Sequence, residues 1–176
     1  MPGAKGQGGA DGETGEAFEE FFDRLMPRAL LVGRRILGSR PDAEDAAVEA
    51  MARAYVAWDR LAAASHRDAW VLRVTSNVAY DQVRHRRREV GRLQVSTEAQ
   101  EPAAEVDLRL TLLPLLHRLS RRQREVVTLS HLAGLTHEEI AAALGCSVGS
   151  VKVHARRGMD KLRADLGVAP QGIEEA

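Results

Sequence analysis

The chain of 176 residues is long enough for one or two small domains, and its hydrophobic fraction of 44% is ordinary for a globular protein. Aromatic residues make up only 4%, so the core has to be built from Ala, Val and Leu, which favours thin helical bundles over broad β-sandwiches. The 25 basic and 25 acidic residues cancel, so net charge says nothing about a nucleic-acid partner, and a single cysteine excludes an internal disulfide.

Residues 1–15 form a Gly-rich segment that cannot offset the entropy lost on ordering, so we expect them to be disordered. The segment lacks the charged and apolar parts of a signal peptide. No later stretch approaches the roughly 20 apolar residues of a membrane span. These observations predict a cytoplasmic protein without a membrane span.

A first domain is predicted over residues 16–90, where the hydrophobic pattern is helical throughout. Interruptions at 38–41 and around 62–66 divide the pattern into about three helices. Asp42 follows the first interruption and is expected to be the N-cap of the second helix.

The exposed face of this second helix carries carboxylates mixed with apolar groups. Asp45 and Glu49 lie four residues apart, and Arg53 follows one turn later. Like charges at this spacing repel by a few tenths of a kcal/mol, so the face suits a basic, partly apolar protein partner. The alternative is an ordinary solvated face with an arginine nearby, and the residues alone favour that alternative.

The third helix, from about Arg67 to Arg88, has an apolar side and a second side suited to unpaired nucleic acid. On the second side, aromatic rings can stack on bases, an amide can bond base edges and guanidinium groups can meet phosphates. For Asp81 the alternative is a simple ion pair with Arg84 or His85. The residues of this side are Trp70, Arg73, Asn77, Tyr80, Asp81, Arg84 and Arg88.

Helical periodicity disappears over residues 91–108, where Pro102 and a run of acidic and small polar residues predict a flexible acidic linker. A second domain is predicted over residues 109–168, and the tail, 169–176, is expected to be disordered. The fold class that follows is all-α, with two small helical domains joined by the linker.

Capping signals place the helices of the second domain. Two pairs of residues have the spacing of a capping box, in which each side chain satisfies a free backbone donor. A short helix, a tight turn and a longer helix then follow with the spacing of a DNA-binding helix-turn-helix (winged-helix-like) module. The signals are the boxes Ser120/Gln123 and Thr136/Glu139, the helix end Gly145 and the N-cap Ser147.

The last helix of this module has one polar, basic face. A glycine and a serine in its first turn allow close approach to a duplex, and its basic side chains suit phosphates and guanine edges. Val153 would be exposed on this face, where it can touch a thymine methyl, which disfavours the alternative of a solvated face on a purely structural bundle. The predicted duplex contacts are Gly149, Ser150, Lys152, Val153, Arg156 and Arg157.

Three blocks of residues, in a fixed order, carry a family resemblance. They are Asp42-Ala43-Glu44-Asp45 with Glu49, Arg53 and Ala54; Trp70-Val71-Leu72-Arg73-Val74 with Asn77, Asp81 and Arg84; and Leu113-Pro114, Glu125-Val126, Glu139-Ile140-Ala141, Ser147, Gly149-Ser150-Val151-Lys152 and Arg157. Over about Phe18 to Leu166 the chain resembles the bacterial extracytoplasmic-function (ECF) sigma factors, the small two-domain members of the main sigma family. The three blocks together are far more specific than a helix-turn-helix alone.

The resemblance implies a sigma factor that binds core RNA polymerase and directs promoter recognition, promoter melting and transcription initiation. It implies that Asp45, Glu49 and Arg53 dock on the polymerase. The side of the third helix from Trp70 to Arg88 would capture the melted −10 element, and the helix from Gly149 to Arg157 would read the −35 duplex. The linker would run near the active-site channel of the polymerase.

The partners implied are core RNA polymerase and promoter DNA, both as duplex and as melted single strand. An anti-sigma factor is a further partner that the resemblance allows. Bond formation would belong to the polymerase, so we expect no catalytic residue, no metal and no cofactor. The protein would be cytoplasmic and associated with the nucleoid when bound to polymerase.

The chain departs from the usual family pattern beside two of its predicted interfaces. The first departures concern docking on polymerase, and the later ones lie beside the DNA face, so promoter preference is not carried over. The departing residues are Val48, Met51, Val153, His154, Gly158 and Met159.

The sequence has two alternative readings from other classes of function. A stand-alone helix-turn-helix transcriptional regulator with an N-terminal helical sensor or dimer domain would bind a promoter without polymerase. An enzyme using Asp45, Glu49 and nearby histidines lacks a Gly-rich loop, a nucleophile constellation or metal-ligand spacing. The resemblance favours the sigma factor over both.

Overall fold

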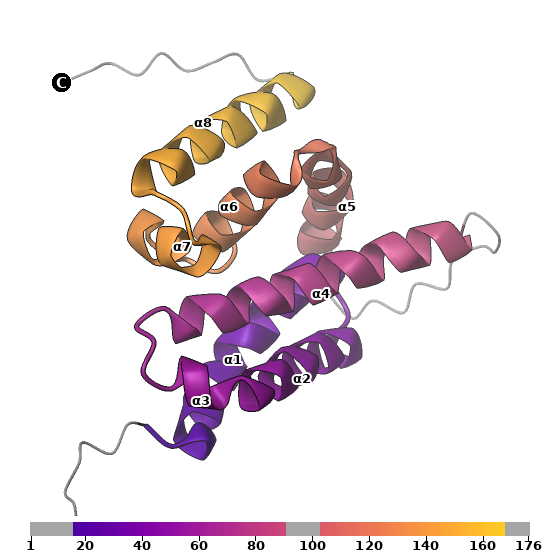
Figure 1. Cartoon of the computed structure of the whole chain (residues 1–176). Helices are drawn as coiled ribbons and strands as arrows, with labels where there is room; N and C mark the ends of the chain where they lie inside the picture. The colour runs from indigo at the N-terminus through magenta and orange to yellow at the C-terminus, as the bar shows by residue number, and fades with distance from the viewer. Residues whose placement is uncertain (1–15, 91–102, 168–176) are drawn as a thin grey trace, which may run out of the picture.

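The computed structural model describes residues 16–90 and 103–167, and all regular structure within them is α-helical (Figure 1). The predicted all-α class is therefore confirmed. The N-terminal half holds four helices instead of about three, because a single helical turn, α3, precedes the break around 62–66. The helices are α1 (Phe18–Leu37), α2 (Arg40–Val56), α3 (Trp58–Leu61), α4 (Arg67–Val90), α5 (Ala103–Arg118), α6 (Arg121–His131), α7 (His137–Leu144) and α8 (Val148–Asp165).

Helices α1, α2 and α4 pack against one another around a few large apolar side chains. Phe21 of α1, Met51 of α2 and Leu72 of α4 are each exposed by 2% or less. The buried side of α2 is otherwise built from alanines, so the helices approach closely. A Cβ on Gly33 of α1 would lie only 3.2 Å from the Cβ of Ala43 on α2, which is closer than an ordinary contact, so the glycine allows the two helices to approach closely.

The N-cap of α2 is Ser39, and the prediction of Asp42 at this position is wrong. The Ser39 hydroxyl accepts a hydrogen bond from the Asp42 backbone N–H at 3.5 Å. The Asp42 carboxylate instead forms an ion pair with Arg86 of α4, which lowers the pKa of that carboxyl. A long-range partner on another helix therefore decides the role of Asp42, and the local pattern contains no sign of it.

The helix-turn-helix prediction is confirmed in detail by the capping contacts. Both capping boxes are present, with the Thr136 backbone N–H donating to Glu139 at 2.8 Å in the second. Gly145 ends α7 in a left-handed conformation with φ of 63°, and the Ser147 hydroxyl caps α8 by accepting from the Ser150 N–H at 3.1 Å. These caps fix the short turn between α7 and α8.

Helix α8 lies across α6 at very close range. Val151 and Leu162 are the large buried side chains of α8, and Gly158 is buried between them. A Cβ on Gly158 would come within 2.8 Å of a methyl group of Val127 on α6. The glycine therefore sets how near the last helix lies to the rest of its module.

Helix α4 lies between the two halves of the molecule (Figure 1). It packs on α1 and α2 on one side and on α6 and α7 on the other. The buried side chains of both halves consequently join in one cluster. Helix α5 begins at Ala103, inside the segment predicted as linker, and residues 91–102 lie outside the described part of the chain. Of the described helices, none is both long and apolar enough to cross a membrane.

Candidate nucleic-acid interface

The predicted duplex-reading face of α8 is open to solvent. Lys152, Arg156 and Arg157 are exposed, and Val153 keeps 46% of its surface exposed. Gly149 leaves space at the start of the helix, since a Cβ there would meet only the Ser147 hydroxyl, at 3.8 Å. The structure thus brings these predicted residues together on one accessible face, with Ser150 partly buried beside them.

Arg156 forms a weak ion pair on this face. Its Nε lies 3.8 Å from Asp160, and its side chain is 81% exposed. An exposed pair at this distance contributes about 1 kcal/mol or less, so it leaves the guanidinium available to a stronger acceptor such as a guanine edge or a phosphate.

The predicted docking face of α2 combines an ion pair with exposed apolar groups. Asp45 is exposed, and Arg53 donates from Nε to Glu49 at 2.8 Å, as the alternative of a solvated face anticipated. On the same helix, Tyr55 and Val56 expose 64% and 87% of their surface. Exposed apolar groups of this size beside charges are typical of a surface that a partner covers.

The C-terminal part of α4 leaves a shallow hollow against α2. It has a volume of about 400 Å³, and Arg53 of α2 faces Asp81, Arg84 and Arg88 of α4 across it. Arg84 donates to Asp81 at 2.6 Å, so the local ion pair predicted as an alternative is present. The hollow joins residues predicted for polymerase docking to residues predicted for single-stranded DNA.

The middle of the predicted single-strand side, at Arg73 and Tyr80, is covered instead of open. Tyr80 is only 6% exposed, and its hydroxyl is hydrogen-bonded to Thr128 of α6 at 2.8 Å. The ring of His117 meets the Tyr80 ring edge-on, and Arg124 lies 5.3 Å from its centre. Burial raises the pKa of the Tyr80 phenol. The expectation that Tyr80 lies on a free surface is therefore wrong for this conformation, while Trp70 and Asn77 are half-buried.

Arg73 of α4 reaches into the C-terminal module. It donates to the backbone carbonyl of Ala143 at 3.0 Å, and its Nε lies 3.6 Å from the Glu125 carboxylate. The Glu125 side chain is only 3% exposed and also lies within 3.5 Å of Arg121 and 3.2 Å of Arg122. A buried carboxylate needs such partners, because an unpaired one is strongly disfavoured.

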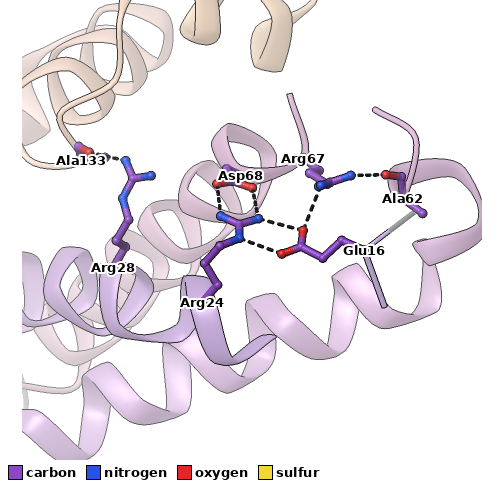
Figure 2. A network of polar contacts seen from close by, with 7 residues as sticks. All are labelled: Glu16, Arg24, Arg28, Ala62, Arg67, Asp68 and Ala133. Atoms are coloured by element: carbon purple, nitrogen blue, oxygen red, sulfur yellow. Dashed lines mark hydrogen bonds and ion pairs between the residues drawn. The ribbon is translucent and has the colours of Figure 1, made fainter. Parts of the chain in front are cut away.

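A polar network fixes the start of α4 (Figure 2). The Glu16 carboxylate accepts from Arg24 at 2.8 Å and from Arg67 at 2.9 Å, and Arg24 also donates to Asp68 at 2.6 Å. Arg67 in turn donates to the carbonyl of Ala62 in the break before α4. The hydrogen bond from Arg24 lowers the pKa of Glu16. The network ties α1 to the helix turn that precedes Trp70.

Two family models match the chain, one in each half. Residues 21–89 match the sigma-70 region 2, and residues 109–162 match the sigma-70 region 4. The chain is 37% identical to an RNA polymerase sigma-E factor of Streptomyces avermitilis over 89% of this chain and 88% of the relative. It is 31% identical to the ECF RNA polymerase sigma factor EcfG of Rhodopseudomonas palustris, over 74% and 75% of the two chains.

The chain belongs to the ECF sigma factors. Solved structures agree with this placement. The sigma factor RpoE in complex with the anti-sigma factor NepR from Bartonella quintana has 26% identity and a TM-score of 0.59, over 87% of this chain and 98% of the other. CnrH in complex with the cytosolic domain of CnrY has 25% identity and a TM-score of 0.61, over 87% and 89%.

As an ECF sigma factor, the protein acts with RNA polymerase in transcription initiation and recognises promoter DNA. The alternative of a stand-alone regulator is not favoured, because both halves match sigma regions. The contacts of Glu125 with Arg73 and of Thr128 with Tyr80 are not predicted from the sequence, although Glu125 belongs to the third block of the family resemblance. A local signal is that both residues stand beside the buried valines and leucine of α6.

Proposed function

We propose that three surfaces of this chain divide the work of promoter recognition. The exposed face of α8 reads the −35 duplex, the side of α4 from Trp70 to Arg88 holds the melted −10 strand, and the exposed face of α2 docks on core RNA polymerase. The open, basic face of α8 on a fully capped helix-turn-helix carries this proposal.

The chemistry of α8 suits a duplex. The N-terminus of a capped helix supplies backbone N–H groups and a positive dipole end for a phosphate, and Gly149 keeps the approach open. Lys152 and Arg157 suit phosphates, whereas Arg156 has the planar donors that match a guanine edge. Val153 supplies an apolar contact of the size of a thymine methyl.

The chemistry of α4 suits a single strand. Trp70 offers a ring on which a base can stack, and Asn77 can bond the edge of an unpaired base. Arg84 and Arg88 lie at the exposed end of the helix, where they can follow the phosphates. Arg73 would add a guanidinium for a phosphate and Tyr80 a second ring for stacking, although the C-terminal module covers both in this structure.

The proposed docking face on α2 consists of Asp45 and the Glu49–Arg53 pair, together with the neighbouring Tyr55 and Val56. Charged groups there would set orientation and association rate, and the apolar groups would supply burial. The proposed domains are residues 16–90 for polymerase and −10 binding and 109–168 for −35 binding. In this proposal bond formation is left to the polymerase, and the protein works with it in the cytoplasm at the nucleoid.

Reconstituted transcription tests the α8 assignment. Arg156→Ala should weaken binding of the polymerase complex to the upstream duplex by about 1–3 kcal/mol, if the guanidinium contacts a base. Arg163→Ala is the matched control, because it removes the same charge from the last turn of α8, where Arg163 lies near Asp160. Equal footprints and equal affinities for both variants would remove Arg156 from the reading face.

A further inference from the structure

The segment 62–66, between α3 and α4, buries little that would hold it in place. Its side chains are three alanines, a serine and a histidine, and two of the five residues are exposed. Backbone bonds join the segment to the helices on either side, from the Ala64 N–H to Leu61 at 2.8 Å and from the Trp70 N–H to His66 at 2.8 Å. A segment that buries so little apolar surface keeps one conformation only if other groups fix it.

Arg67, the first residue of α4, holds the start of this segment. Its guanidinium donates to the backbone carbonyl of Ala62 and, through a second nitrogen, to the Glu16 carboxylate at 2.9 Å (Figure 2). The Ala62 carbonyl follows the end of α3, where a helix has free acceptors. The planar fork of an arginine makes both bonds at once, so the carbonyl and the carboxylate are kept at a fixed separation.

The Glu16 carboxylate is itself firmly held. It accepts two hydrogen bonds from Arg24, at 2.8 and 3.0 Å, and Arg24 donates to Asp68 of α4 at 2.6 Å. The guanidinium groups of Arg24 and Arg67 lie over the fully buried ring of Phe21, at 5.4 and 5.9 Å from its centre. The contact of Glu16 with Arg67, which we call the Glu16–Arg67 clamp, is therefore anchored on the core side of α1.

The clamped segment forms one wall of a hollow beside Trp70. The hollow has a volume of about 280 Å³ and is lined by Trp70, by Ala64 and His66 of the segment, and by three residues in and just before α3. The position of segment 62–66 consequently sets the room beside the Trp70 ring. Under the proposed function a base stacks on this ring, so a displaced segment would change the fit of that base.

We propose that Arg67 and Glu16 are positioning residues for strand capture: the Glu16–Arg67 clamp fixes segment 62–66 beside Trp70 and makes no contact with DNA itself. This inference rests on the proposed function, since it takes Trp70 as part of the single-strand side. Glu16 precedes α1 and carries a charge that repels a phosphate, so it acts through Arg67. Loss of either residue should lower promoter melting and leave the first contact with duplex DNA unchanged.

The size of the effect follows from the fraction of chains whose segment is in place. A strand that binds only this arrangement has its apparent affinity reduced by the fraction of chains that adopt it. Loss of one hydrogen bond shifts such an equilibrium by about three- to tenfold. The ratio of open to closed promoter complexes should therefore fall by about three- to tenfold in a variant without the clamp.

Two single variants and their double variant test the clamp. Arg67→Met keeps an unbranched side chain and removes the donors, while Glu16→Gln keeps the size and removes the charge. Each protein is bound to core RNA polymerase, and permanganate reactivity of thymines measures melting of a promoter that the unchanged chain opens. Both variants should show the expected loss, and R67M/E16Q should show no further loss, because the two residues act through one contact. The controls Arg40→Met and Glu20→Gln change exposed side chains and should melt the promoter normally.

Salt dependence separates positioning from direct contact with DNA. Removal of an arginine that binds a phosphate reduces the slope of log affinity against log salt concentration by about 1. Removal of a positioning residue leaves this slope unchanged, so the polymerase complexes with R67M, with E16Q and with the unchanged chain should have equal slopes on the promoter. A reduced slope for R67M together with normal melting for E16Q would make Arg67 a phosphate ligand and overturn the proposal.

The fluorescence of Trp70 reports the position of the segment without DNA. Trp58→Phe removes the other tryptophan and leaves one indole. In this background acrylamide should quench Trp70 more strongly in R67M and E16Q than in Glu20→Gln, because the segment then leaves the side of the ring. Circular dichroism and competition for core polymerase verify that all variants fold and assemble. Equal quenching in all proteins would show that the segment stays in place without the clamp and would overturn the proposal.

Trp70→Leu distinguishes a failure of this inference from a failure of the proposed function. The variant keeps an apolar side chain and removes the ring on which a base stacks. If Trp70→Leu lowers melting and the clamp variants do not, the positioning role is wrong and Trp70 keeps its assignment. If Trp70→Leu melts the promoter normally, the assignment of Trp70 is wrong and the positioning role is wrong with it.

Discussion

Glu16 forms ion pairs with one arginine of α1 and one arginine at the start of α4. Its carboxylate receives hydrogen bonds from Arg24 and Arg67, and its side chain is only 19% exposed. The pKa of Glu16 is lowered, first by the hydrogen bond from Arg24. The position of the helix turn before Trp70 therefore depends on an ionised glutamate.

A pH dependence follows from the lowered pKa of Glu16. A carboxylate with a lowered pKa in the folded state stabilises that state above its ordinary pKa of 4.5, and the contribution disappears as the pH falls through the folded value. Glu16→Gln should therefore lower the free energy of unfolding by about 0.5–1 kcal/mol at pH 7, because Arg24 is 43% exposed and the network is screened. Urea unfolding at pH 7 and near pH 3 would measure it.

The free energies of unfolding of the two proteins should become equal near pH 3, because Glu16 of the unchanged chain is then protonated as well. Glu20→Gln is the control, since Glu20 is an exposed glutamate of the same helix. The free energies of unfolding of Glu16→Gln and of the unchanged chain could instead differ equally at both pH values. That result would show that the ion pairs do not stabilise the fold.

At the scale of the helix, the sequence predicts most of the helix starts and ends that depend on neighbouring residues. The two capping boxes, the left-handed Gly145 and the Ser147 cap depend on residues within four positions of one another, and all of them are found as predicted. The cap of α2 was misplaced, because Ser39 and Asp42 are both suitable caps and only Arg86, far along the chain, distinguishes their roles.

Gly158 gives a prediction for the packing of α8 on α6. Gly158→Ala gains helix propensity of about 1 kcal/mol, but the new Cβ would lie 2.8 Å from a methyl group of Val127, whose branched side chain is stiff in a helix. Overpacking of this kind costs about 1–3 kcal/mol, so we expect a net loss of stability in thermal unfolding.

Two variants separate packing from propensity at this position. Gly149→Ala adds the same methyl group to the same helix in open space and should be neutral or stabilising. The pair V127A/G158A removes the obstructing methyl groups and should recover part of the stability lost by Gly158→Ala. A Gly158→Ala protein as stable as the Gly149→Ala protein would mean that α8 shifts on α6 without strain.

At the scale of the whole molecule, the decisive feature is the position of α4 between the halves. The sequence predicts two domains and an accessible α4, since both follow from periodicity and composition. It cannot predict that Arg73 and Tyr80 meet Glu125 and Thr128, because those contacts span at least 48 residues and depend on how two separately patterned units pack. The site is thus predicted as a set of residues but not as a covered surface.

The joined core has a calorimetric consequence. Because buried side chains of both halves belong to one cluster, the unchanged chain should unfold in a single cooperative transition. In the variant E125Q/T128V the two halves lose polar contacts that align them. Its unfolding transition should therefore be broader or divided into two. Differential scanning calorimetry would check this, with E138Q as control, and two well-separated transitions in the unchanged chain would contradict it.

The double engagement of Arg73 and Tyr80 also bears on how such a protein can evolve. Under the proposed function, a substitution at either position alters two contacts together, one with DNA and one with the chain's own Glu125 or Thr128. Val153, in contrast, is an exposed residue of α8. New promoter preferences are therefore expected to arise by drift on α8, while the positions of α4 that we propose for strand capture change only together with their partners on α6.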